Sequence, residues 1–212
     1  CRDFVRTTTE PQAPTLTPEL ELYLAHPDHT YWTMDDEALE ASYLPPPYWG
    51  FAWSGGQALA RYILDHPELV RGRRVLDFAA GSALEAIAAV RAGARQVYAN
   101  DIDPLAEAAI ELNAELNQAE VEIISGDIVG SALPHIDVVL SGDICYEGPL
   151  ADRVMTWFRA LTHRGVLVLV GDPGRAYLPK MGLEELVRYH PEEIRVLEDG
   201  DLRRAAVHRV IG

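Results

Sequence analysis

The stretch "VLDFAAGSALEAIAA", Val75 to Ala89, is the segment from which the rest of the chain is interpreted. It joins an apolar run of strand length to a short turn at Gly81 and then to an alanine-rich run of helix length. A strand, a tight turn and a helix in this order form the usual cradle of a nucleotide-like ligand. Ala79 and Ala83 stand where such turns usually carry glycine. These two replacements limit the ligands that the turn can bind, because alanine allows less backbone freedom than glycine.

A dinucleotide does not suit this turn. Binding of a pyrophosphate needs three glycines in the pattern G-x-G-x-x-G, and here Leu84 occupies the place of the third. A ligand without phosphate, such as S-adenosylmethionine, demands less of the backbone. We expect Gly81 to supply the freedom that remains necessary, and Ala79 and Ala83 to be tolerated with negative φ.

Apolar runs of strand and helix length alternate along most of the chain. Asp103 followed by Pro104 is a typical helix start, with the aspartate as cap. The alternation predicts a doubly wound α/β sheet. The predicted helices are 17–24, 54–64, 82–91, 104–116 and 150–161, and the predicted strands are 74–78, 96–100, 121–124, 136–140 and 165–170.

The end of the chain departs from this alternation. The segment "IRVLEDGDLRRAAVHRVIG" contains two strand-like runs joined across Asp199-Gly200, a strong hairpin signal. We therefore expect the last two strands to be antiparallel, which a purely parallel dinucleotide-binding sheet does not show.

Composition restricts the classes of partner. The 212 residues carry a formal net charge of −15, which repels nucleic-acid backbones and favours a cationic partner such as a lysine-bearing protein surface. No apolar run is long enough to span a membrane, and no secretory signal pattern opens the chain. Cys1 and Cys145 have no disulfide framework, and the histidines show no metal-ligand spacing. We expect a cytoplasmic monomer without a metal.

Carboxylates stand at or just after the ends of three of the predicted strands. Asp77 can orient the turn or meet the ammonium of the cofactor, and it can equally hold the start of the next helix. Asp101 is suited to accept both ribose hydroxyls, because Asp103 is the better helix cap. Asp127 can accept from the adenine amino group, or it can be a plain turn aspartate.

Several of these segments carry a family resemblance. They are "LTPELELYL", "PPYWGFAWSGGQALARYILDHPELVRG", "VLDFAAGS", "ANDIDPLAEAAIELNAELN", "GDICYE" and "GDPGR". The chain resembles the class I, seven-strand S-adenosylmethionine-dependent methyltransferases, and more narrowly the lysine methyltransferases of the electron transfer flavoprotein β-subunit and their bacterial relatives. Residues after 180 match less well.

The resemblance implies a fold and a division of the chain. The expected fold is a Rossmann-like, seven-stranded, mostly parallel sheet with an antiparallel C-terminal hairpin. Residues 51–212 form the methyltransferase domain, and residues 1–50 are an extension that contributes to the substrate channel.

The resemblance also implies roles for individual residues. Asp143 and Tyr146 form a D-x-x-Y element beside the transferred methyl group, where Asp143 orients the amine, and Arg175 touches the protein substrate or forms a structural ion pair. The residues expected to bind S-adenosylmethionine, and afterwards its product S-adenosylhomocysteine, are Trp53, Gly56, Asp77, Ala79, Gly81, Asp101, Ile102, Asp127 and Gly142; those expected to meet the substrate are Tyr48, Trp49 and Arg175.

Three functions remain open at this point. The first is a protein-lysine N-methyltransferase that acts on the electron transfer flavoprotein β-subunit. The second is an N-methyltransferase of small amines or RNA; for RNA, the sequence after the fourth strand argues against it, because Gly142-Asp143-Ile144-Cys145 replaces the Asn-Pro-Pro-Tyr typical of such enzymes. The third is a regulatory module that binds S-adenosylmethionine without catalysis, for which the two alanines of the turn are the support.

Overall fold

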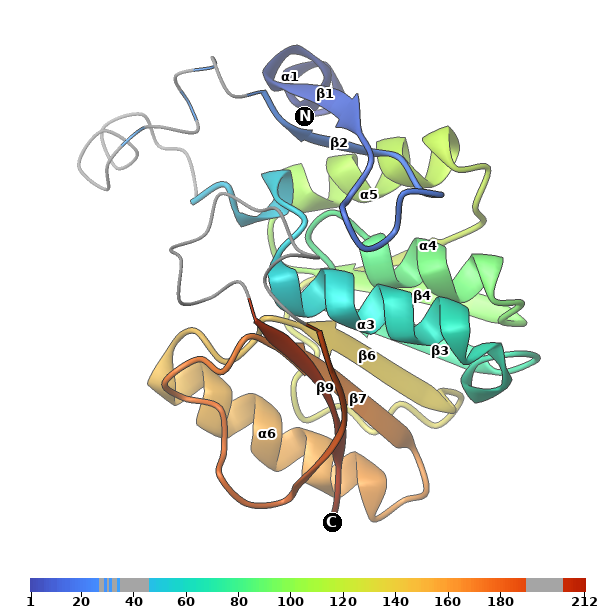
Figure 1. Cartoon of the computed structure of the whole chain (residues 1–212), viewed down its shortest axis with the longest axis vertical. Helices are drawn as coiled ribbons and strands as arrows, with labels where there is room; N and C mark the ends of the chain where they lie inside the picture. The colour runs from blue at the N-terminus through green and yellow to red at the C-terminus, as the bar shows by residue number, and fades with distance from the viewer. Residues whose placement is uncertain (27–28, 30, 32–33, 35–45, 190–203) are drawn as a thin grey trace.

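The core of the protein is a seven-stranded sheet in the order β5-β4-β3-β6-β7-β9-β8 (Figure 1). The computed structural model describes residues 1–26, 29, 31, 34, 46–189 and 204–212. Strands β5, β4, β3, β6 and β7 are parallel, and β9 runs antiparallel to both of its neighbours. The predicted fold class is confirmed. The strands are β3 (Arg74–Phe78), β4 (Gln96–Asp101), β5 (Glu122–Ser125), β6 (Val138–Gly142), β7 (Leu167–Asp172), β8 (Leu183–Tyr189) and β9 (Ala205–Val210).

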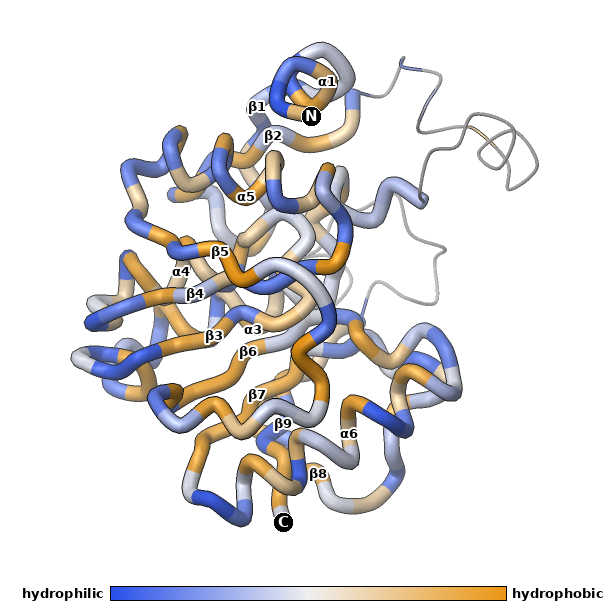
Figure 2. The backbone as a smooth tube through the Cα atoms, turned by 180° about the vertical axis from the view of Figure 1, so that it is seen from behind, coloured by the Kyte–Doolittle hydropathy of each residue, from blue (hydrophilic) through white to orange (hydrophobic). Residues whose placement is uncertain are grey.

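Helices cover the sheet through two separate apolar cores. Alternate strand residues such as Val75 and Leu140 pack with α3 (Ser54–Asp65) and α4 (Leu84–Arg91). Their neighbours in sequence, such as Leu76 and Val139, pack instead with α6 (Gly148–Thr162). Burial on both faces explains why these strands are mostly apolar, as the largely orange course of β6 and β7 in Figure 2 shows. Among the described residues, no helix has both the length and the apolar character that crossing a bilayer requires.

The C-terminal hairpin differs in detail from the predicted one. Strand β9 pairs with β8, with Val210 opposite Leu183 and Ala205 opposite Tyr189. The predicted turn at Asp199-Gly200 lies outside the described residues. Strand β8 was not predicted from the sequence. It contains two glutamates and one arginine, which interrupt the alternation of apolar and polar residues by which a strand is recognised.

The predicted helix over residues 17–24 is wrong. Residues Leu22–Ala25 form strand β2, which pairs antiparallel with β1 (Thr9–Gln12) after the short helix α1 (Arg2–Thr8). Contacts with α5 (Pro104–Leu116) fix this extended backbone, since Tyr23 N donates to Asn113 Oδ1 at 2.7 Å. Tertiary hydrogen bonds therefore override the local start signal at Thr17 and Pro18. By contrast, the predicted cap of α5 is confirmed, because Asp103 Oδ1 accepts from Leu105 N at 2.8 Å.

The strand order reverses between β3 and β6. The chain proceeds from β3 outward to β5 and then returns to place β6 on the other side of β3. Helices after neighbouring strands thus diverge at the carboxyl ends of β3 and β6, which leaves a crevice there. Asp77 and Asp101 lie in the last residues of β3 and β4, and Asp143 directly follows β6, so the segments singled out from the sequence meet at this edge.

Asn113 ties the N-terminal hairpin to the turn before α4. It is fully buried, and its Nδ2 donates to Ser82 O at 2.8 Å while its Oδ1 accepts from Tyr23 N. Asn113→Leu is expected to lower the free energy of unfolding by about 3 kcal/mol, because both backbone groups lose their partner. Urea denaturation measures this, with Glu120→Gln on the exposed loop as control. An unchanged midpoint in the leucine variant would contradict the assigned role.

Candidate functional site

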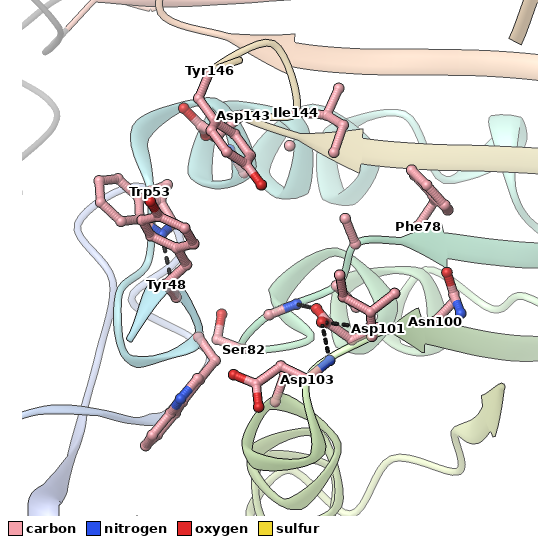
Figure 3. Close-up of a pocket in the computed structure, with 18 of the residues that line it drawn as sticks. Tyr48, Trp53, Phe78, Ser82, Asn100, Asp101, Asp103, Asp143, Ile144 and Tyr146 are labelled. Atoms are coloured by element: carbon pink, nitrogen blue, oxygen red, sulfur yellow. Dashed lines mark hydrogen bonds between the residues drawn. The ribbon is translucent and has the colours of Figure 1, made fainter. Parts of the chain in front are cut away.

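A cavity of about 610 Å³ opens where the strand order reverses, at the carboxyl ends of β3, β4 and β6 (Figure 3). A volume of this size suits a ligand as large as a nucleoside with an amino-acid tail. Thirteen of the fourteen predicted site residues line it, and Asp77 does not. Those that line it are Tyr48, Trp49, Trp53, Gly56, Ala79, Gly81, Asp101, Ile102, Asp127, Gly142, Asp143, Tyr146 and Arg175.

The turn between β3 and α4 adopts left-handed backbone geometry at both alanines. Ala79 has φ of 55° and Ala83 has φ of 63°, so the expectation of negative φ is wrong at both. The surrounding hydrogen bonds impose this geometry, since Ala80 N donates to Asn100 O at 3.0 Å and Gly81 N donates to Asp101 Oδ2 at 2.9 Å. The turn therefore has the shape of a glycine-rich turn, at the cost of strain in two alanines.

Asp77 lies beneath the turn. It is fully buried, and its Oδ2 accepts from Ala86 N in α4 at 2.8 Å. Of the two roles considered from the sequence, this contact is that of a carboxylate that holds the start of the helix. Burial raises the pKa of Asp77 to about 7; the bond from Ala86 opposes the shift and the charge of Asp101 adds to it.

Asp101 closes the turn from the neighbouring strand. Besides the bond from Gly81, its Oδ1 accepts from Ile102 N at 2.8 Å and from Asp103 N at 3.0 Å. Burial raises the pKa of Asp101 despite these three donors. The carboxylate is thus held in one orientation at the cavity, while the side chain of Ile102 is 75% exposed at its edge.

Asp143 forms the opposite wall, on a strained backbone with φ of 56°. Its amide donates to Gly171 O at 2.8 Å, and its Oδ2 accepts from Gly56 N, the second glycine of α3, at 3.0 Å. Its Oδ1 accepts from Arg175 Nη2 at 2.8 Å and from Nε at 3.2 Å. Strained backbone that its surroundings hold in place is typical of functional sites.

Arg175 reaches Asp143 because of the turn after β7. Asp172 Oδ1 accepts from the backbone N–H groups of Gly174 and Arg175, each at 2.7 Å. The Arg175 guanidinium then lies 5.7 Å from the ring centre of Trp53. Only 15% of the Arg175 side chain and 8% of the Asp143 side chain are exposed. The ion pair considered for Arg175 from the sequence is therefore present, and it lies inside the cavity.

The helix α3 begins in direct backbone contact with the strand ends. A side chain at Gly55 would collide with Gly171 O and with Asp143 Oδ2, and a side chain at Gly142 would collide with the Cα of Gly56. A methyl group on Gly56 would lie 3.1 Å from Glu85 Oε1. Glycine at these places lets the first turn of α3 reach Asp143.

Aromatic rings form the mouth of the cavity. Tyr48 and Tyr146 face each other with ring centres 5.4 Å apart, and they are 51% and 45% exposed. Trp53 Nε1 donates to Tyr48 O at 2.8 Å, which fixes the indole beside them. Partial burial raises the pKa of Tyr146. Trp49 differs from these rings, because it is 1% exposed and packs against Tyr31.

Asp127, the predicted adenine acceptor, already has partners. Its Oδ2 forms an ion pair with Arg153 of α6, and its Oδ1 accepts from Val129 N at 3.0 Å. The hydrogen bond from Arg153 lowers the pKa of Asp127. Both members of the pair line the cavity, so they are positioned as a unit.

Glu85 is the pocket residue of most chemical interest that the sequence analysis missed. It lies in the first turn of α4, is 5% exposed, and lines the cavity. The signal was present in the sequence, since Glu85 is the one charged residue in the run Leu84 to Val90. Apolar neighbours such as Phe78, Ile144 and Leu150 were also missed, because they follow the pattern of core residues.

Comparisons with known proteins agree on one class. The family model described as "Ribosomal protein L11 methyltransferase (PrmA)" matches residues 58–171. An electron transfer flavoprotein beta subunit lysine methyltransferase from Danio rerio is 43% identical over 178 residues, which is 82% of this chain and 68% of that protein. The counterpart from Mus musculus is 39% identical over 199 residues, 91% of this chain and 76% of that protein.

A solved structure also shares the fold. The ribosomal protein L11 methylase from Lactobacillus delbrueckii subsp. bulgaricus superposes with a TM-score of 0.52 at 20% identity. The match covers 74% of this chain and 79% of that one. At this identity the likeness concerns the fold alone.

The strain at Ala79 predicts an unusual response to glycine. Ala79→Gly is expected to raise the free energy of unfolding by up to about 1 kcal/mol, because relief of the left-handed strain exceeds the entropy gained by the unfolded chain. The matched control is Ala80→Gly, since Ala80 has no positive φ and is expected to lose stability. Thermal and urea unfolding measure both. Equal destabilisation of the two variants would contradict strain at Ala79.

The buried carboxyl of Asp77 predicts a pH dependence of stability. With its pKa raised from 3.8 to about 7, folded Asp77 binds a proton between these values that the unfolded chain has lost. The free energy of unfolding therefore falls as pH rises from about 4 to 7. Asp77→Asn keeps the acceptor for Ala86 N and should flatten this fall, which urea denaturation at pH 5, 6 and 7 measures. Parallel profiles for the two proteins would exclude Asp77 as the cause.

Proposed function

The chain belongs to the family of the electron transfer flavoprotein β-subunit lysine methyltransferases, and we propose that it methylates that subunit with S-adenosylmethionine. As a member of this family it is an enzyme, a protein-lysine N-methyltransferase. The observation that carries the proposal is the cavity in which Asp143 and Tyr146 face the Ala79–Ala83 turn and Asp101 (Figure 3).

The residues of the cavity fit S-adenosylmethionine. Asp101 offers the ribose hydroxyls a carboxylate whose orientation three backbone bonds fix. Ile102 and the Asp127–Arg153 pair offer an apolar surface and a polar edge for adenine. Gly56 at the start of α3 lies at the wall where the amino-acid end is expected. This cofactor supplies the methyl group as an electrophile on its sulfonium.

The aromatic mouth suits a lysine side chain. We propose that Tyr48, Tyr146 and Trp53 enclose the aliphatic part of the lysine, with residues 1–50 contributing this wall of the channel through Tyr48 and Trp49. A lysine must be neutral to accept a methyl group, which costs about 4.6 kcal/mol at pH 7 in water. Aromatic walls lower this cost, because a water-poor channel disfavours the ammonium.

Asp143 is suited to orient the amine more than to remove its proton. Both of its oxygens are already acceptors, from Gly56 N and from the Arg175 guanidinium. The positive charge of Arg175 offsets that of the carboxylate, so Asp143 does not strongly stabilise the ammonium. An N–H group of the neutral amine can still donate to Asp143 Oδ1 or Oδ2, which directs the nitrogen lone pair along the line of methyl transfer.

The net charge of −15 agrees with a protein substrate that presents lysine on a basic surface. We infer that the protein acts as a monomer in the cytoplasm and needs neither nucleic acid nor a membrane.

Asp143→Asn tests this function. The amide cannot hold both Arg175 and the amine in the same way, so kcat for methylation should fall by about 100-fold. Mass spectrometry of purified bacterial electron transfer flavoprotein, incubated with S-adenosylmethionine, measures the added methyl groups. Asp152→Asn on the exposed face of α6 is the control and should keep full activity.

Two results would count against the proposal in different ways. Wild-type protein that methylates other proteins of a lysate but not the flavoprotein would refute the substrate. Full activity of Asp143→Asn would refute the role of Asp143.

A further inference from the structure

Glu85 places a carboxyl group between the start of α3 and the end of β6. A side chain at Gly142 would collide with Glu85 Oε1, and one at Gly56 would come within 3.1 Å of the same atom. The carboxyl thus fills the space that these two glycines leave, and Glu85 lines the cavity. Within the described part of the chain, no ion pair joins Glu85 to an arginine, lysine or histidine.

Such a position is costly for a charged group. Burial raises the pKa of Glu85 well above its usual value, and the neighbouring carboxylates of Asp77 and Asp143 raise it further. Backbone hydrogen bonds, including one with Gly142, oppose the shift. Asp77 on β3 and Asp143 after β6, the latter paired with Arg175, are the charged groups that face Glu85; α3 contributes only the backbone of Gly56. An apolar residue would avoid this cost, so the carboxyl calls for an explanation.

We propose that Glu85 binds the α-ammonium group at the amino-acid end of S-adenosylmethionine. The inference rests on the proposed function, because it concerns the cofactor assigned there. Glu85 lies beside Gly56 at the start of α3, whereas Asp101, the expected ribose position, ends strand β4. A buried carboxylate and an ammonium ion compensate each other in a water-poor site, provided that they meet directly.

The other carboxylates near the cavity already have partners. Asp77 accepts from Ala86 N and does not line the cavity. Asp101 accepts from three backbone amides of the turn and the strand end. Asp143 forms an ion pair with Arg175, and Asp127 forms one with Arg153. Asp103, which also lines the cavity, caps α5 through Leu105 N. Among the described carboxyls of the cavity, Glu85 is therefore the one that is buried and forms no ion pair, so that a ligand cation can neutralise it.

Proton balance makes this binding measurable. Burial raises the pKa of Glu85 and a bound ammonium lowers it again, so ligand binding releases to the buffer the proton that the buried carboxyl holds. Calorimetric titration with S-adenosylhomocysteine, in buffers of different ionisation enthalpy at pH 7, counts the protons released. 5′-Methylthioadenosine, which lacks the amino-acid end, is the matched ligand and should release none.

The matched variant is Glu85→Gln, which keeps the shape and cannot ionise. It should weaken S-adenosylhomocysteine binding by about 10- to 100-fold and abolish proton release, because a charge-assisted bond is lost. Binding of 5′-methylthioadenosine should not change. Glu120→Gln, on the exposed loop after α5, controls for the loss of one negative charge and should behave as the wild type.

Other outcomes overturn the inference. Unchanged binding of S-adenosylhomocysteine by Glu85→Gln, or equal weakening of both nucleosides, would make Glu85 a packing residue and leave the proposed function intact. The wild-type proton count tests the inference even if the variant fails to fold, and equal release with both nucleosides would refute it. Failure of wild-type protein to bind either nucleoside would refute the cofactor as well.

Discussion

The backbone contact between α3 and the ends of β6 and β7 is the constraint on which the site depends. Gly55 and Gly171 touch without any side chain between them, and Gly56 meets Gly142 in the same way. Such an approach brings the N–H of Gly56 to the carboxylate of Asp143. It also leaves just enough space for the carboxyl of Glu85. A side chain at Gly55, Gly142 or Gly171 would move α3 away from the sheet and separate groups that come from four different segments of the chain.

Three of the five non-glycine residues with positive φ in the described part of the chain lie in the turns beside the cavity. Asp143, Ala79 and Ala83 all have positive φ, and all three lie between the end of a sheet strand and the helix after it. At these places the chain must turn sharply, because the crevice between β3 and β6 requires the strand ends to remain open. Hydrogen bonds to neighbouring strands hold each turn in place, as the bonds from Asp143 N to Gly171 O and from Ala80 N to Asn100 O show. Hydrogen bonds to the sheet thus compensate for the unfavourable backbone geometry of the turns at the cavity.

Much of this arrangement could be predicted from the sequence, since apolar runs identify the buried strands, and the turn at Gly81 together with carboxylates such as Asp101 indicates where a ligand binds. The φ angles of Ala79 and Ala83 could not be predicted, because they depend on hydrogen bonds to the next strand. Strand β2 was missed for a similar reason: the signal at Thr17 is local, whereas the side chains of α5 that hold the extended chain lie far away in sequence. Glu85 stood out as a charge in an apolar helix, but only the structure shows that it faces Gly56 and the cavity.

The distribution of charge in the pocket also affects the reaction, because the cofactor carries a positive sulfonium and the substrate lysine arrives as an ammonium ion. Both the sulfonium of the proposed cofactor and a protonated lysine are attracted by acidic side chains, and an uncompensated carboxylate beside the amine would keep the amine protonated and unreactive. In this cavity Arg175 compensates Asp143, which lies beside Tyr146 of the aromatic mouth (Figure 3). Asp101 and Glu85, where we expect the ribose and the amino-acid end, form no ion pair within the described part of the chain. Negative charge is thus available to hold the cofactor, and it is offset where the lysine must lose its proton. A pocket with only acidic side chains would keep the lysine protonated.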